Sequence, residues 1–128
     1  MSMRATSGIS KAAKCTAAIA TQFLLCTPGA DDDTFSVASA STNPLVGVFQ
    51  SSTANAGDSV EVMVTGISNV VLDGNVTRGN YVTSDANGKG VAAAPAAGSN
   101  SNYIGIALES GVAGDIIAVL LCPGSIQG

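Results

Sequence analysis

Short runs of alternating apolar and polar residues, separated by clusters of Gly, Asn, Asp, Ser and Pro, cover most of the chain. The cleanest run is residues 59–65, where valines at every second position alternate with Ser59, Glu61 and Thr65. Side chains of a strand point alternately to its two faces. This run therefore predicts a strand with one buried and one solvated face.

The remaining pattern also favours strands over helices. Residues 81–93 predict a hairpin with a tight turn at Asn87-Gly88, because both residue types tolerate positive φ. Residues 92–102 are low in complexity and predict a loop. Only residues 9–20 could form a helical turn or two. We therefore expect an all-β fold, either a small β-sandwich or a barrel-like domain.

Two stretches of the chain resemble each other, at residues 45–66 and 103–124. Each has an apolar-Gly-apolar run, a Gly-Asp turn and a closing apolar strand. The same spacing places Phe23-Leu24 against Tyr81-Val82. One interpretation is a duplication within a single domain. The other is that any all-β chain rich in Val and Gly looks self-similar.

On the duplication hypothesis, residues 15–128 form a single β domain of two similar units, at about residues 15–66 and 68–124. Each unit is half of a sandwich or barrel and cannot bury its apolar face alone. A short extended arm, residues 1–14, precedes the domain.

The last strand differs from its earlier counterpart, because both of its faces are apolar. Ile116, Ala118 and Leu120 lie on one face, and the preceding strand adds Tyr103. Burying four such side chains contributes on the order of 5–10 kcal/mol before entropy costs. We expect these residues to contact either the N-terminal segment of the chain or a neighbouring subunit.

Charge is distributed unevenly along the chain. Arg4, Lys11 and Lys14 stand in the first 14 residues without an acid, whereas the rest of the chain has two bases and nine acids. An acidic body argues against a nucleic-acid partner, because phosphate binding requires a concentrated basic face. The arm itself is either a contact segment or a disordered terminus.

The cysteines and the apolar runs indicate the cellular compartment in which the protein is made. Cys15, Cys26 and Cys122 are an odd count without paired spacing, which favours reduced thiols made in a cytoplasm over a Cys15–Cys26 bridge. No run is long enough to span a membrane. Residues 1–30 could be interpreted as a signal peptide, but a strand explains the same residues better.

Residues suited to catalysis, cofactors or metals are few. The chain has no His, so the commonest general base and any Ser-His pair are missing. Asp31–Asp33 could hold a hard cation, but a solvated loop between two strands is the better interpretation. Asp73 and Asp85 stand in turn sequences. We expect no catalytic, cofactor-binding or metal-binding residues, although a small Asp-dependent enzyme stays open as an alternative.

Three motifs together resemble those of the capsid cement, or head-decoration, proteins of tailed bacteriophages. They are the stretch from Gly79 to Lys89, the strand Ile104-Gly105-Ile106-Ala107 and the turn Ala113-Gly114-Asp115. The similarity extends over roughly residues 20–122.

The resemblance implies a structural role. Such proteins dock on the outside of the phage head, commonly as trimers, and clamp major capsid subunits against the pressure of packaged DNA. It implies a virion location after synthesis in the bacterial cytoplasm. The first 14 residues depart from the family pattern, and our own hypothesis is that they contact the capsid through Arg4, Lys11 and Lys14. The alternative function is a small binding module for carbohydrate or a host surface, for which exposed aromatic side chains would be expected.

Overall fold

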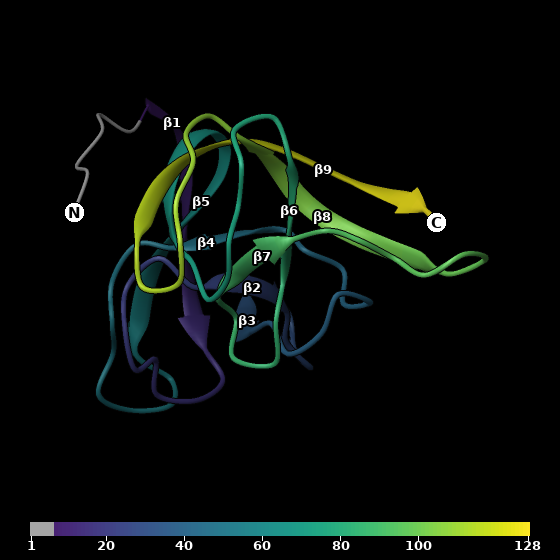
Figure 1. Cartoon of the computed structure of the whole chain (residues 1–128). Coiled ribbons are helices and arrows are strands. Elements are labelled where there is room, and N and C mark those ends of the chain that lie inside the picture. The colour runs from purple at the N-terminus through teal and green to yellow at the C-terminus, as the bar shows by residue number, and fades with distance from the viewer. Residues whose placement is uncertain (1–6) are drawn as a thin grey trace.

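The structure is a computed structural model that describes residues 7–128. These residues form nine strands: β1 (Ser7–Cys15), β2 (Leu25–Pro28), β3 (Thr34–Val37), β4 (Gly47–Phe49), β5 (Ser59–Val71), β6 (Tyr81–Ser84), β7 (Gly90–Ala92), β8 (Asn100–Ala107) and β9 (Ile116–Gln127). The predicted all-β fold is confirmed (Figure 1). None of the described residues belongs to a helix that could cross a bilayer.

The first half of the chain closes on itself as a small barrel. Its strands follow the order β1-β3-β2-β4-β5, and β5 also pairs with β1. The β1–β3 pairing is parallel, whereas the other pairings in this ring are antiparallel. Closure removes the free edges that an open sheet of short strands would expose.

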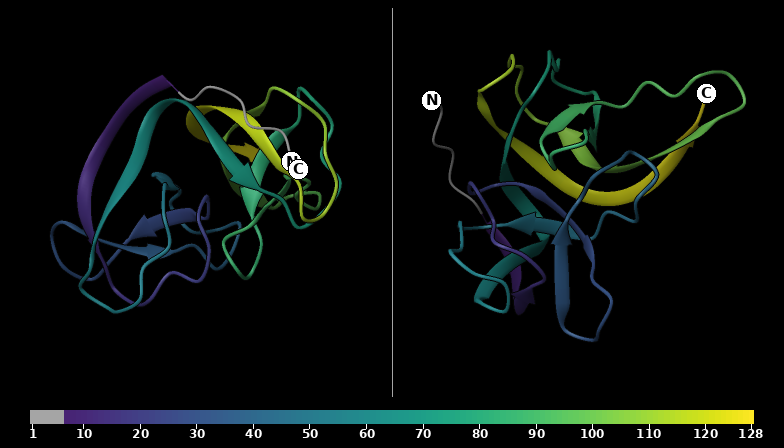
Figure 2. Two further views of the ribbon diagram at one scale, coloured as in Figure 1. Left: turned by 90° about the vertical axis from the view of Figure 1, so that its left-hand side faces the viewer. Right: turned by 90° about the horizontal axis from the view of Figure 1, so that it is seen from below.

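The second half is built on the far end of β5. That strand continues past the first barrel and pairs with β9, which is followed in the sheet by β8, β6 and β7. A parallel bridge between Leu72 and Gly90 connects β7 back to the end of β5. The two halves lie side by side, with β5 shared between them (Figure 2).

Hydrogen bonds of the first half recur in the second, about 57 residues later. The amide of Cys15 donates to Asp58 O, and the amide of Leu72 donates to Asp115 O. The mutual pair Ile19–Thr53 recurs as Val76–Gly111. Positive φ angles recur as well, at Gly57 and Gly114 and at Phe23 and Gly79. The two halves thus share one architecture, and its origin in a duplication stays our interpretation.

These bonds also set the alignment of the two halves. Cys26 pairs with Gly47, and Val82 pairs with Gly105. Since the glycines are equivalent, Cys26 corresponds to Val82, so the spacing that placed Phe23-Leu24 against Tyr81-Val82 is two residues out. The strand pairing that recurs in the second half begins within β1, ahead of residue 15, where the first unit was predicted to start.

The N-terminal segment is where the structure departs most from prediction. Residues 9–20 form no helical turn: β1 extends to Cys15, and eight of its residues pair with β5. Residues 7–14 of the predicted arm are therefore part of the barrel, while residues 1–6 lie outside the described residues. Ala and Lys favour helices locally, but strand pairing along β1 outweighs that propensity.

The other predicted elements are close to those observed. The strand at 59–65 is confirmed and continues to Val71 through Gly66, which has φ +100°. The hairpin at 81–93 is confirmed as β6 and β7. Its turn is wider than expected, since Gly88 has positive φ and Asn87 does not. The predicted loop 92–102 ends early, because residues 100–102 pair with the end of β9.

Two apolar clusters form the core. One lies within the first barrel and includes Cys15, Cys26 and Phe49. The other joins the halves, since it contains Leu25 and Val48 of the first together with Val82 and Val119 of the second. All three cysteines are free thiols, and burial raises the pKa of Cys26 far above its ordinary value.

Candidate functional site

A row of apolar side chains crosses four strands on the outside of the second half. Ile67 of β5 pairs with Leu120 of β9, which pairs with Ile106 of β8, which pairs with Tyr81 of β6. Residues directly opposite one another share a face of the sheet. Leu120 is 40% exposed and Tyr81 39%, while Ile67 and Ile106 are half-buried. We call these four residues the apolar row.

Tyr103 extends the apolar row at one end. Its ring lies 4.3 Å from the ring of Tyr81, centroid to centroid, with the planes tilted by 32°. Offset aromatic pairs of this kind contribute about 1 kcal/mol beyond their buried area. The contact gives Tyr81 a defined position although much of its ring faces solvent.

The equivalent row in the first half is covered by the chain itself. Its members pair in the same order across four strands, namely Ser10, Met63, Val48 and Leu25. Leu25 and Val48 are fully buried and Met63 nearly so, all in the cluster that joins the two halves. The second half has an apolar residue at every position of its row, but within residues 7–128 that row is only partly covered. Exposed apolar patches of this kind mark interaction sites.

The other residues predicted to make this contact are placed differently. Ala118 is buried, and its amide donates to the Glu109 carboxylate at 3.0 Å. Its carbonyl accepts from the amide of Leu108. Ile116 is half-buried and packs on the core between the halves. The cover on this part of β9 therefore comes from its own chain, and Leu120 is the accessible member of the predicted set.

The three predicted basic residues do not converge on one face. Lys11 and Lys14 are three positions apart on β1, so their side chains leave opposite faces of the strand. Lys11 Nζ lies 3.0 Å from Asp33 Oδ1 in an exposed ion pair, which contributes little to stability. Lys14 is exposed opposite Ser59. Arg4 lies outside the described residues.

The acidic stretches form turns. Asp31–Asp33 connect β2 to β3, as the loop interpretation expected. Within residues 7–128 no group of three or more Cys, Asp or Glu side chains could hold a metal ion. Asp85 is held more firmly, since its Oδ1 accepts from the amides of Asn87 at 2.8 Å and Lys89 at 2.9 Å.

Asp73 and Asp85 share a hydrogen bond that moves their pKa values apart. It raises the pKa of Asp73. Burial pushes the pKa of Asp85 upward, but the bonds from Asp73, Asn87 and Lys89 outweigh burial and lower it. A carboxylate with a lowered pKa stabilises the folded state above its unfolded pKa. That stability is lost as the pH falls through the folded value.

We therefore expect Asp85→Ala to lower the free energy of unfolding at pH 7 by about 1 kcal/mol, the net worth of a hydrogen bond of this kind. The loss should shrink below pH 3.8, the ordinary value for Asp, as the wild-type carboxylate takes up its proton. Urea unfolding at pH 7 and pH 2.5 measures both differences. A loss that is equal at the two pH values would contradict the role given to the carboxylate.

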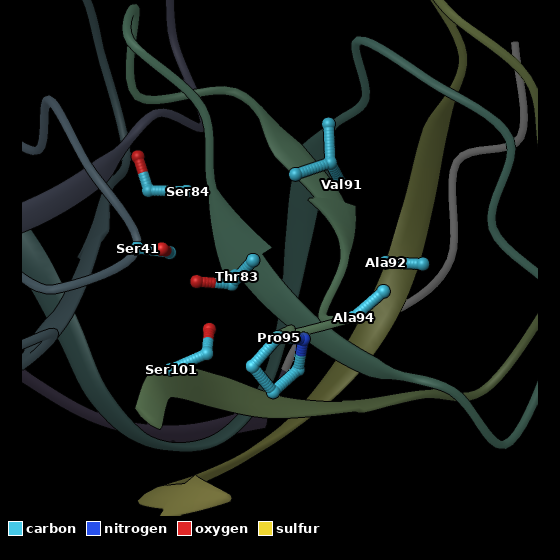
Figure 3. A pocket seen from close by; sticks show the side chains of 8 residues that line it. All are labelled: Ser41, Thr83, Ser84, Val91, Ala92, Ala94, Pro95 and Ser101. Atoms are coloured by element: carbon cyan, nitrogen blue, oxygen red, sulfur yellow. The ribbon is translucent and has the colours of Figure 1, made fainter. Parts of the chain in front are cut away.

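A pocket of about 260 Å³ lies where the two halves meet (Figure 3). Asn102 of β8 joins the two halves beside this pocket. Its amide donates to Ser41 O, and its side-chain Nδ2 donates to Thr42 O and Asn43 O. Hydroxyl groups occupy one side and small apolar side chains the other (Figure 3). The lining residues are Ser41, Thr83, Ser84, Val91, Ala92, Ala94, Pro95 and Ser101.

Comparison with known sequences gives a specific match. Residues 19–122 match the sequence family described as phage cement protein, and this region is most of the chain. The chain belongs to the phage cement protein family. The resemblance noted from its motifs is thereby confirmed. This cement protein accordingly has a structural, capsid-decorating role in a phage. No curated protein matches its sequence.

The fold of this cement protein is shared with a solved phage structure. That structure is the N base of head fiber gp8.5 in bacteriophage phi29. The two superpose with a TM-score of 0.67 at 18% sequence identity, over 89% of this chain and 93% of the other. At this identity the likeness concerns the fold alone.

Sequence reasoning missed three members of the apolar row of this cement protein. Ile67, Ile106 and Tyr81 are adjacent to Leu120 only through strand pairing, between residues far apart in the chain. The repeat carried a usable signal. The alignment of residues 45–66 with 103–124 already sets Val48 against Ile106, and a gap of one residue before the Gly-Asp turn would also have set Met63 against Leu120.

Proposed function

We propose that this cement protein binds the outer surface of the phage head and contacts the major capsid protein there. Its role is to hold neighbouring capsid subunits together against the pressure of packaged DNA, rather than to catalyse a reaction. The observation that supports this most is the apolar row in a chain of the cement family. A carbohydrate-binding role has less support, since Tyr81, at 39%, is the most exposed of the three Phe and two Tyr residues.

We further propose that a second copy of the chain covers the apolar row, giving an oligomer, for which the family resemblance suggests a trimer. The support is internal to the chain: the equivalent row in the first half is covered by a unit of the same architecture. Four residues form only the centre of a stable interface, which buries about 1,600 Å² in total. Neighbouring polar residues would form its rim.

Basic residues at the N-terminus add electrostatic contacts to the capsid in this proposal. Arg4 and Lys14 are the candidates, since Lys11 already has a carboxylate partner. Deleting the whole segment cannot test them, because residues 7–14 are needed to close the first barrel.

Substitution tests the electrostatic contact without disturbing the barrel. We expect Lys14→Gln to weaken capsid binding about threefold in 50 mM salt, and the difference to vanish in 500 mM salt, where exposed charges are screened. Lys89→Gln, a change of the same type in the second half, is the matched control. A Lys14→Gln variant that binds like wild type in low salt would contradict the contact.

A further inference from the structure

Four hydroxyl groups stand on the polar wall of the pocket in Figure 3, and three of them, those of Thr83, Ser84 and Ser101, offer only acceptors. Thr83 Oγ1 donates to Asn102 O at 2.6 Å, and Ser84 Oγ donates to Asp85 O at 2.8 Å. Ser101 Oγ makes a longer bond, also to Asn102 O, at 3.4 Å. A carbonyl oxygen cannot donate, so each hydroxyl has used its one proton. These three buried hydroxyls therefore present lone pairs to the pocket, and the half-buried hydroxyl of Ser41 can accept a hydrogen bond beside them.

The opposite wall is apolar. It consists of Val91, Ala92, Ala94 and Pro95, and no charged or aromatic side chain lines the pocket. A matching ligand thus needs an apolar stem that ends in hydrogen-bond donors. A sugar fits poorly, because it prefers an aromatic surface and the pocket has none. A guanidinium also fits poorly, because its flat fork suits coplanar oxygens such as those of a carboxylate.

A primary alkylammonium group has the required form. The side chain of lysine carries three N–H donors and no acceptor at the end of a four-carbon stem. Lysine commonly packs this stem along apolar surface. The volume of about 260 Å³ accommodates it, and the net charge of −4 on the chain favours the approach of a cation.

We propose that this pocket receives a lysine side chain of the protein on which the chain docks. The inference rests on the proposed function for the identity of that partner, the major capsid protein. The pocket itself is pre-formed, since the hydrogen bonds of Asn102 hold the turn at residues 41–43 against β8. Pre-formed sites bind without the entropy cost of ordering their walls.

The first experiment tests the pocket without a capsid. ¹⁵N-labelled protein is titrated with butylammonium chloride, and amide shifts are followed by NMR. We expect saturable shifts at Thr83, Ser84 and Ser101. Tetramethylammonium, a cation without N–H donors, should not produce them. Absence of saturable shifts with butylammonium, or equal shifts with both cations, would overturn the proposal.

The second experiment tests the source of the lysine. The double variant Thr83→Val/Ser84→Ala removes two acceptors with little change of shape, and Ser99→Ala, an exposed serine outside the pocket, is its control. We expect the double variant to bind capsids about tenfold more weakly than wild type, as for loss of hydrogen bonds to a charged group. Circular dichroism should show the same β signal for all three proteins.

The outcomes separate the two claims. Failure of the wild-type protein to bind capsids contradicts the proposed function, and the NMR titration then decides the pocket alone. Equal capsid binding by the wild type and the double variant overturns the lysine inference while leaving the proposed function intact.

Discussion

Leu120→Asp is expected to sediment as a monomer at micromolar concentrations where the wild-type protein forms an oligomer. Leu120 is 40% exposed at the centre of the apolar row, between Ile67 and Ile106. Covering a leucine contributes about 2 kcal/mol, and a carboxylate in the same place adds a desolvation cost. The association constant should fall at least about 30-fold for each contact, given tenfold per 1.4 kcal/mol.

The control for this variant is Val112→Asp. Val112 is 54% exposed, but it stands in the turn between β8 and β9 rather than in the apolar row. We expect it to sediment like wild type. Circular dichroism should be unchanged for both variants, because neither side chain is in the core. Wild-type protein that is monomeric at these concentrations, or equal effects of the two variants, would argue against a subunit contact on the row.

The second large effect is expected for Gly105→Ala. A methyl group at Gly105 would collide with the carbonyl oxygen of Leu120 on the neighbouring strand β9. Backbone atoms of a paired strand cannot move aside without breaking the pairing. We therefore expect a loss of about 3 kcal/mol, at the upper end of overpacking effects. Since domains of this size are stable by only about 5–15 kcal/mol, this is a substantial part of the total.

Two further glycines complete that test. Gly47 is equivalent to Gly105 in the first half, and a methyl group there would lie 2.6 Å from Met63 O. Gly47→Ala should therefore destabilise to a similar degree. Gly74→Ala is the control, because its nearest contact would be an ordinary 3.5 Å to Val91 Cγ1. Urea unfolding ranks the three variants. If the Gly105→Ala variant proved as stable as the Gly74→Ala variant, strands β8 and β9 would approach each other less closely than described.

Much of the fold could be predicted from local patterns in the sequence. Alternation identified residues 59–65 as a strand, and the turn residues near Asn87 identified the hairpin. The boundary of the arm at residue 14 rested on the distribution of charge, whereas residues 7–14 belong to β1 in the structure. Pairing along β1 decides that segment instead, and pairing between distant residues is not visible in local propensity.

The candidate site was predictable only in part. The apolar character of both faces of β9 pointed to Leu120, but it could not distinguish residues covered by the chain from residues left exposed. Ala118 is buried within its own chain, and its backbone is hydrogen-bonded to Leu108 and Glu109. The pocket was not visible at all, because its hydroxyl residues are ordinary strand residues until the two halves meet.

Electron microscopy of capsids that lack the protein, mixed with purified protein, tests most directly whether this cement protein decorates the outside of a phage head, as we propose. We expect added density at regular positions on the outer surface, in contact with major capsid subunits. Capsids that show no added density at saturating protein concentration, or density only on the inner surface, would contradict it.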